Sequence, residues 1–159
     1  MDKKRVGWFS FTCCEDSTIL FTELLNTHWD EWKQKVEFVH ARVLKTKGEL
    51  KDLDIAFVEG AIVGKEQIAE LQKIRDNSKI LIAIGACACT AMPSGWRNTF
   101  DAQTKQEIQW LVDRFGHLDR VEPLSKFVTV DDRVPGCPMD EQRFLQIMHK
   151  YLNQKPVTS

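Results

Sequence analysis

Short apolar runs alternate with longer amphipathic segments along most of this chain of 159 residues. Runs rich in valine, isoleucine and phenylalanine are typical of buried strands, and they occupy residues 6–11, 37–44, 54–59, 79–84 and 127–130. Between them, apolar side chains recur at helical spacing over residues 16–32, 62–75, 104–115 and 139–151. Residues 85–95, which follow the fourth run, contain glycine and proline and predict a loop.

This order of strands and helices predicts an α/β fold in which a parallel sheet carries helices on both faces, giving three layers. About five strands in a chain of this length favour a flavodoxin-like strand order over a full dinucleotide-binding fold. The length is also typical of one domain. We therefore expect residues 1–159 to form a single flavodoxin-like domain.

Charge and hydropathy exclude several classes of function. Lysine and arginine number 22 against 23 aspartate and glutamate, so the chain has no cationic field for nucleic acid. The longest strongly apolar run, residues 80–91, is well short of the roughly 20 residues that cross a bilayer, so we expect no membrane span. The residues after the basic N-terminus lack the apolar stretch of a signal peptide, which favours a cytoplasmic location.

The cysteines are the residues most indicative of function. Cys13 and Cys14 follow the first predicted strand, Cys87 follows the fourth, and Cys137 lies in a glycine-proline turn. Ligands of open parallel sheets bind beyond the carboxyl ends of the strands, so these four thiols can meet at one edge. Four thiolates suit zinc or an iron-sulfur cluster, and their wide separation disfavours a zinc finger. We therefore predict one [4Fe-4S] cluster held by these four cysteines, and we interpret Cys89 as buried filler.

Other side chains leave alternatives open. The four histidines show no paired metal-ligand spacing, and the glycines at 60 and 64 lack the pattern of a phosphate-binding loop. Glu15 and Asp16 are either first-turn acids that stabilise the helix or part of a proton path. The N-terminus of that helix could face the cluster sulfurs and raise the reduction potential. An FMN-binding protein and a zinc-stabilised interaction module remain possible interpretations of the same pattern.

Three ordered motifs resemble a known family. They are the strand that ends in Cys13-Cys14, the segment Gly85-Ala86-Cys87-Ala88, and Val134-Pro135-Gly136-Cys137-Pro138. Together they resemble the family shared by the small subunits of nickel-iron hydrogenases and the 20 kDa cluster subunit of respiratory complex I. Residues 54–61 and Arg97-Asn98 look like those of the soluble cytoplasmic hydrogenases.

The resemblance implies an electron-transfer subunit whose single [4Fe-4S] cluster is bound by Cys13, Cys14, Cys87 and Cys137. Its partners would be a hydrogenase large subunit, which holds the catalytic nickel-iron centre, and further electron-transfer subunits. Most hydrogenase small subunits have a C-x2-C first motif, whereas the adjacent cysteines here are the complex I form. A complex I-like subunit that passes electrons to quinone is therefore the alternative. We expect Trp96 to help form an apolar partner face, while Arg97 either joins that face or is a plain surface charge.

Overall fold

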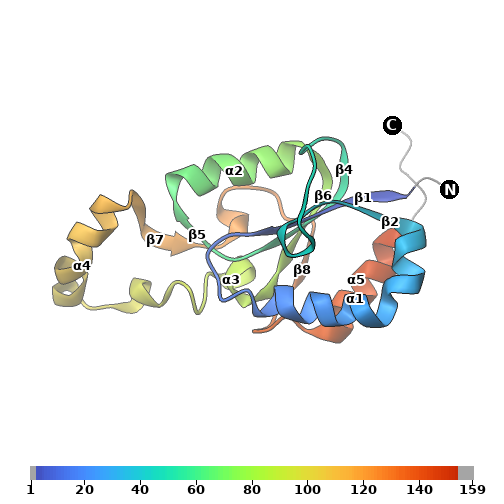
Figure 1. The fold of residues 1–159 in the computed structure, drawn as a ribbon. Coiled ribbons are helices and arrows are strands. Elements are labelled where there is room, and N and C mark those ends of the chain that lie inside the picture. The colour runs from blue at the N-terminus through green and yellow to red at the C-terminus, as the bar shows by residue number, and fades with distance from the viewer. Residues whose placement is uncertain (1–2, 154–159) are drawn as a thin grey trace.

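A six-stranded sheet in the order β3-β2-β1-β4-β6-β8 forms the centre of the protein (Figure 1). The computed structural model describes residues 3–153. The strands of the sheet are β1 (Lys4–Ser10), β2 (Val36–Ala41), β3 (Thr46–Lys47), β4 (Leu53–Glu59), β6 (Ser78–Ile84) and β8 (Asp132–Val134). All neighbouring strands pair in parallel except β2 with β3, which are antiparallel. The five parallel strands thus follow the flavodoxin-like order, which confirms the predicted fold class.

Helices cover both faces of the sheet and give three layers (Figure 1). Helices α1 (Asp16–Lys35) and α5 (Glu141–Leu152) lie on one face, and α2 (Lys65–Asp76) and α3 (Gly85–Thr90) lie toward the other. Trp8 of β1 is buried beneath α1 and stacks on Phe21, with ring centroids 4.2 Å apart. Alternate side chains of each parallel strand therefore enter opposite cores, because successive residues of a strand point to opposite faces.

A smaller part of the chain extends from one end of the sheet, where α4 lies in Figure 1. It contains α4 (Ala102–Arg114) and a two-stranded antiparallel sheet of β5 (Ile62–Gly64) and β7 (His117–Glu122). Three short 3-10 turns complete the chain: η1 (Arg42–Leu44), η2 (Trp96–Thr99) and η3 (Leu124–Lys126). Helix α4 buries only Val112, so most of its surface lacks a partner within the described residues.

Several local predictions were wrong. Residues 127–130 form no strand, and the fifth parallel strand is β8, whose sequence Asp132-Arg133-Val134 is too short and polar to be recognised from an apolar run. Residues 85–90 form the short helix α3 and not a loop. The helix expected from residue 62 begins at Lys65, because residues 62–64 pair with β7, a strand that the sequence pattern did not predict.

A helix that crosses a membrane needs about 20 predominantly apolar residues. None of the helices within residues 3–153 is both long enough and apolar enough to traverse a bilayer.

Candidate metal centre

Two loops and the short helix α3, at the carboxyl edge of the sheet, bring the four predicted cysteines to one small pocket. Cys13 and Cys14 lie between β1 and α1, Cys87 lies in α3 directly after β6, and Cys137 lies between β8 and α5. The pocket is lined by Cys13, Cys14, Asp16, Ser17, Glu59, Ile84, Gly85, Ala86, Cys87, Gly136, Cys137 and Pro138. All four cysteines are free thiols, so the arrangement presents four sulfur donors from distant parts of the chain.

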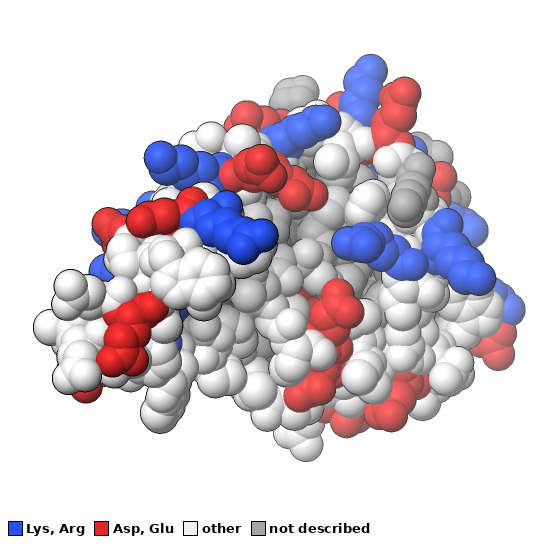
Figure 2. Space-filling model, turned by 60° about the vertical axis from the view of Figure 1, so that its left-hand side comes forward, with Lys and Arg blue, Asp and Glu red and all other residues white. Residues whose placement is uncertain are grey.

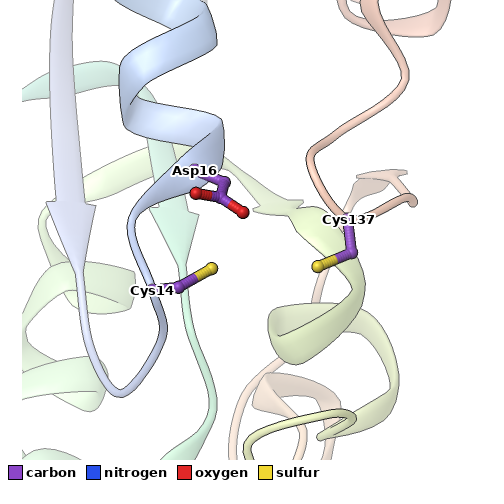
Figure 3. Close-up of side chains that lie close together, drawn as sticks. All are labelled: Cys14, Asp16 and Cys137. Carbon is purple, nitrogen blue, oxygen red and sulfur yellow. The ribbon is translucent and has the colours of Figure 1, made fainter.

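The pocket has a buried side and an exposed side. Cys87 is buried, with 7% of its surface accessible, and Cys13 is half-buried. Cys14 and Cys137 are exposed. Their sulfur atoms and a carboxylate oxygen of Asp16 all lie within 4.8 Å of one another, and Figure 3 shows the three side chains converging. One edge of any group bound between the cysteines would therefore face outward.

Direct hydrogen bonds fix the positions of the cysteine-bearing segments relative to one another. The Ala86 N–H donates to the Gly136 carbonyl at 2.7 Å, which joins helix α3, with Cys87, to the loop of Cys137. The Met139 N–H donates to Ser17 Oγ at 3.1 Å, which joins the loop of Cys137 to helix α1. The pocket geometry is therefore set by contacts between elements far apart in the sequence.

The chain turns sharply at the residue after the adjacent cysteines. Glu15 adopts a left-handed conformation with φ 62°, and helix α1 begins directly after it. This bend lets the chain leave β1 through both cysteines and reverse into α1 over the same pocket.

Acidic groups surround the thiols. Burial and then the Glu59 carboxylate raise the pKa of Cys13 to about 12, against an opposing hydrogen bond from the Glu15 backbone. The Asp16 backbone N–H lowers the pKa of Cys14, but desolvation, the Asp16 carboxylate and Cys137 outweigh it and the pKa is raised. The N-terminus of α1 thus does direct N–H groups at two sulfurs, as predicted, while neighbouring carboxylates oppose its effect.

Glu59 is a buried residue of the site that the sequence pattern did not identify. Only 3% of its surface is accessible, and its carboxylate accepts hydrogen bonds from the Ser17 N–H at 3.1 Å and Thr18 Oγ1 at 2.6 Å. Burial raises its pKa, against these two hydrogen bonds. The available signal was an acidic residue that ends an otherwise apolar strand immediately before a glycine.

Cys89 does not line the pocket. Its thiol points toward the Ala83 carbonyl, with the sulfur 3.8 Å from that oxygen, and burial raises its pKa to about 11. Cys89 is only partly buried and packs against one of the apolar cores, so its interpretation as buried filler stays a prediction.

The two residues predicted near a partner face have different surroundings. Trp96 is 63% exposed. The Arg97 guanidinium donates to the Asp119 carbonyl at 2.9 Å and to the Leu118 carbonyl, so it ties η2 to β7 and is more than a plain surface charge. Trp110, Leu111 and Phe115 are also exposed. On the face of the molecule drawn in Figure 2, areas of uncharged surface lie between charged side chains of both signs.

The fold and this pocket define a flavodoxin-like α/β protein with a four-thiol site suited to a soft metal centre. The chain belongs to the family described as the 20 kDa subunit of NADH ubiquinone oxidoreductase, whose model matches residues 13–151. This match confirms the resemblance inferred from the three cysteine motifs.

Named relatives include hydrogenase subunits. The delta subunit of the NAD-reducing hydrogenase HoxS from Cupriavidus necator is 26% identical over 139 residues, which is 77% of this chain and 66% of that protein. The delta subunit of sulfhydrogenase 2 from Pyrococcus furiosus is 26% identical over 152 residues, which is 91% of this chain and 60% of that protein. A protein of the F420-non-reducing hydrogenase from Methanothermobacter thermautotrophicus is 31% identical over 104 residues, which is 57% of this chain and 34% of that protein. The aligned regions thus span at most two thirds of each relative.

A solved structure confirms the fold. One chain in the crystal structure of an NAD+-reducing [NiFe]-hydrogenase in the H2-reduced state superimposes with a TM-score of 0.79 at 23% identity. The alignment covers 99% of this chain and 96% of that chain.

Proposed function

We propose that the protein is the electron-transfer small subunit of a nickel-iron hydrogenase-type complex. In this proposal Cys13, Cys14, Cys87 and Cys137 bind one [4Fe-4S] cluster, and the cluster relays electrons to or from a catalytic large subunit. The observation that carries the proposal is that these four free thiols, from two loops and helix α3, line one pocket. Family membership and the hydrogenase relatives support it.

The residues of the pocket fit such a group. Four sulfur donors are the ligand set of a [4Fe-4S] cluster. Carboxylates beside Cys13 and Cys14 disfavour the thiolate form of these cysteines when no metal is bound. Thiolates are the form that binds a cluster, and the bound iron would supply the positive charge that stabilises them. Cys14 and Cys137, the two exposed members of the set, lie in the segments between strand and helix and outside the apolar core.

The bound cluster supplies one-electron transfer, and the chain's own residues hold and tune it. The Ser94 hydroxyl is 3.1 Å from Cys87 Sγ, and backbone N–H groups of Glu15 and Asp16 approach the sulfurs of Cys13 and Cys14. Hydrogen bonds to ligand sulfurs adjust the potential of a cluster. We place catalysis on the partner subunit and assign no catalytic residue to this chain.

The alternative of an FMN-binding protein receives less support from the pocket. Flavin sites need apolar or aromatic surface for the ring and donors for the phosphate. The pocket residues include no aromatic ring, and Asp16 and Glu59 would repel a phosphate.

The exposed aromatic residues beyond the cluster pocket favour a partner contact. Trp96, Trp110 and Phe115 each expose more than half of their surface, and such residues are enriched at interfaces. We infer that they meet the large subunit or a further electron-transfer subunit, on a complex located in the cytoplasm.

Metal analysis tests the cluster assignment. Full-length protein reconstituted anaerobically should contain about four irons and four sulfides per chain. Replacing Cys13, Cys14, Cys87 or Cys137 by serine should lower the iron content, whereas Cys89→Ser is the matched control and should keep it. A single zinc without sulfide, or full iron content in Cys137→Ser, would overturn the assignment.

The identity of the partner subunit distinguishes a hydrogenase-type electron-transfer subunit from a complex I-like one. A complex I-like subunit that passes electrons to quinone is favoured by the family description and by the adjacent pair Cys13-Cys14. Sequencing the large subunit that co-purifies with this chain decides between them. Paired C-x2-C motifs near both ends of that subunit would indicate a nickel-iron site. Their absence would favour a complex I-like subunit that passes electrons to quinone.

A further inference from the structure

Asp16 lies at the exposed edge of the cysteine pocket, between two of the proposed ligands. Its carboxylate is within 4.8 Å of both Cys14 Sγ and Cys137 Sγ, although Cys137 is far away in the sequence (Figure 3). We propose that this carboxylate lowers the reduction potential of the cluster and thereby sets the energy at which the subunit exchanges electrons. The inference rests on the proposed function, since it requires that the cluster is present.

Within the described residues, the Asp16 carboxylate forms no ion pair with a lysine, arginine or histidine. The carboxylates that act on Cys13, on the other side of the pocket, are those of Glu59 and Glu15, which are also acids. The carboxylate therefore acts on the sulfurs as a net negative charge.

A negative charge at this position opposes reduction. The electron that reduces a cluster adds negative charge to it, and a carboxylate a few ångströms away makes that addition less favourable. The effect is largest on the sulfurs of Cys14 and Cys137, because these are the atoms that converge on Asp16.

The backbone of the same residue acts in the opposite direction. The Asp16 N–H approaches the Cys14 sulfur, and a hydrogen bond to a ligand sulfur raises the potential of a cluster. Because the N–H belongs to the main chain, a change of side chain removes only the carboxylate. Substitution at residue 16 therefore isolates the contribution of the charge.

The measurement is an EPR-monitored redox titration of the full-length protein reconstituted with iron and sulfide. Asp16→Asn preserves the shape of the side chain, and Asp16→Ala removes the charge without adding a hydrogen-bond donor. Asp30→Asn is the control, because it makes the same charge change on the same helix α1, at an exposed position about 21 Å along the helix axis. Screening at physiological salt acts over about 8 Å, so this distant charge should have little effect.

We expect both Asp16 variants to keep the iron content of the unmodified protein and to shift the potential to more positive values. The control should leave the potential unchanged. An unchanged potential in both Asp16 variants would overturn the inference. A shift in Asp16→Asn but not in Asp16→Ala would also overturn it, because the new amide donor would then be the cause.

Loss of iron in both Asp16 variants would show that the residue is needed for assembly and would contradict a role confined to the potential. These outcomes differ from a failure of the proposed function. If the unmodified protein shows no [4Fe-4S] signal after reconstitution, the cluster assignment fails. If it shows the signal and the variants share its potential, only the role of Asp16 fails.

Discussion

Thr18 Oγ1 donates a hydrogen bond to the buried carboxylate of Glu59 at 2.6 Å. The same hydroxyl oxygen accepts a hydrogen bond from Trp8 Nε1 at 2.9 Å, so one threonine satisfies polar groups on two neighbouring strands. Glu59 lines the cysteine pocket and Trp8 belongs to the aromatic core. Through Thr18, the first turn of α1 is therefore hydrogen-bonded both to a residue that lines the cysteine pocket and to a residue of the aromatic core.

Thr18→Val should destabilise the fold. Valine has nearly the same shape, but it leaves the Trp8 N–H and one Glu59 oxygen without their buried partner, which costs on the order of 2 kcal/mol. Thr27→Val is the matched control, because Thr27 is exposed on the same helix and bonds only to the Glu23 carbonyl. Urea denaturation should show a lower midpoint for Thr18→Val and little change for the control. Equal midpoints for the two variants would contradict the role of this hydrogen-bond chain.

Ser94→Ala should move the cluster potential in the direction opposite to that of the Asp16 variants. The Ser94 hydroxyl lies 3.1 Å from Cys87 Sγ and 2.9 Å from the Thr12 carbonyl, so its one proton has two acceptors within reach. Loss of a donor to a ligand sulfur lowers the potential, so the redox titration should give a more negative value at unchanged iron content. Ser125→Ala, at an exposed serine in η3, serves as the control. A potential that does not move in Ser94→Ala would show that the hydroxyl bonds only to Thr12.

Asp132 gives the fold a dependence on pH. Its carboxylate joins β8 to α5 through Arg143 Nη2 and Lys150 Nζ, each at 2.8 Å, and through the Tyr151 hydroxyl at 3.2 Å. Burial raises its pKa, but the hydrogen bond from Lys150, the Arg133 N–H and the nearby cations outweigh this, and the pKa is lowered on balance.

Asp132→Asn should therefore cost about 1 kcal/mol of unfolding free energy at pH 7, because the partners are partly exposed. A carboxyl whose pKa is lower in the folded state stabilises the fold above its unfolded pKa of about 3.9, and this contribution is lost as the pH falls through the folded pKa. Urea midpoints of variant and unmodified protein should thus differ at pH 7 and converge under acid conditions. Asp30→Asn, which removes an exposed pair with Lys33, should have little effect at any pH. A difference for Asp132→Asn that grows on acidification would contradict this assignment.

The sequence predicted the layers of the fold because the apolar runs at residues 6–11, 54–59 and 79–84 are the central parallel strands β1, β4 and β6, and burial on both faces leaves a continuous apolar signal. Strand β8 lies at the sheet edge and has only three residues, so no such signal marks it. The sequence pattern does not predict strands β5 and β7, because these strands pair with each other across a long stretch of chain and lie outside the main sheet.

The candidate site was predictable to the extent that it depends on loop position. Cys13, Cys14 and Cys87 follow predicted strands, and parallel topology alone brings the segments after those strands to one edge, whereas the strand that precedes Cys137 was not predicted. The roles of Glu59 and Ser94 depend on contacts with residues 41 and 82 positions away, which no local pattern encodes. The same holds for the approach of Asp16 to Cys137.

The glycine before Cys137 provides the most direct test of how the ligand loop is shaped. Gly136 has φ 111°, and a Cβ atom there would lie 2.6 Å from the Pro138 carbonyl oxygen and 2.9 Å from the Asp140 nitrogen. Gly116 also has a positive φ, 62°, but a Cβ atom there would have no atom within 4 Å. Both φ values disfavour a residue with a side chain, but 62° lies within the left-handed α region and 111° lies outside it, so the backbone conformation and the clash both make Gly136 the more sensitive position.

Gly116→Ala should cost roughly 1 kcal/mol, the conformational penalty alone. Gly136→Ala should cost roughly 2–3 kcal/mol, because the turn must also open to relieve contacts with main-chain atoms. Opening this turn displaces Cys137, so the reconstituted Gly136→Ala protein should also hold less iron, while Gly116→Ala keeps its full content. Urea denaturation and iron analysis of the two variants provide both readouts. Full iron content in Gly136→Ala would mean that the Cys137 loop can bind iron without this turn geometry.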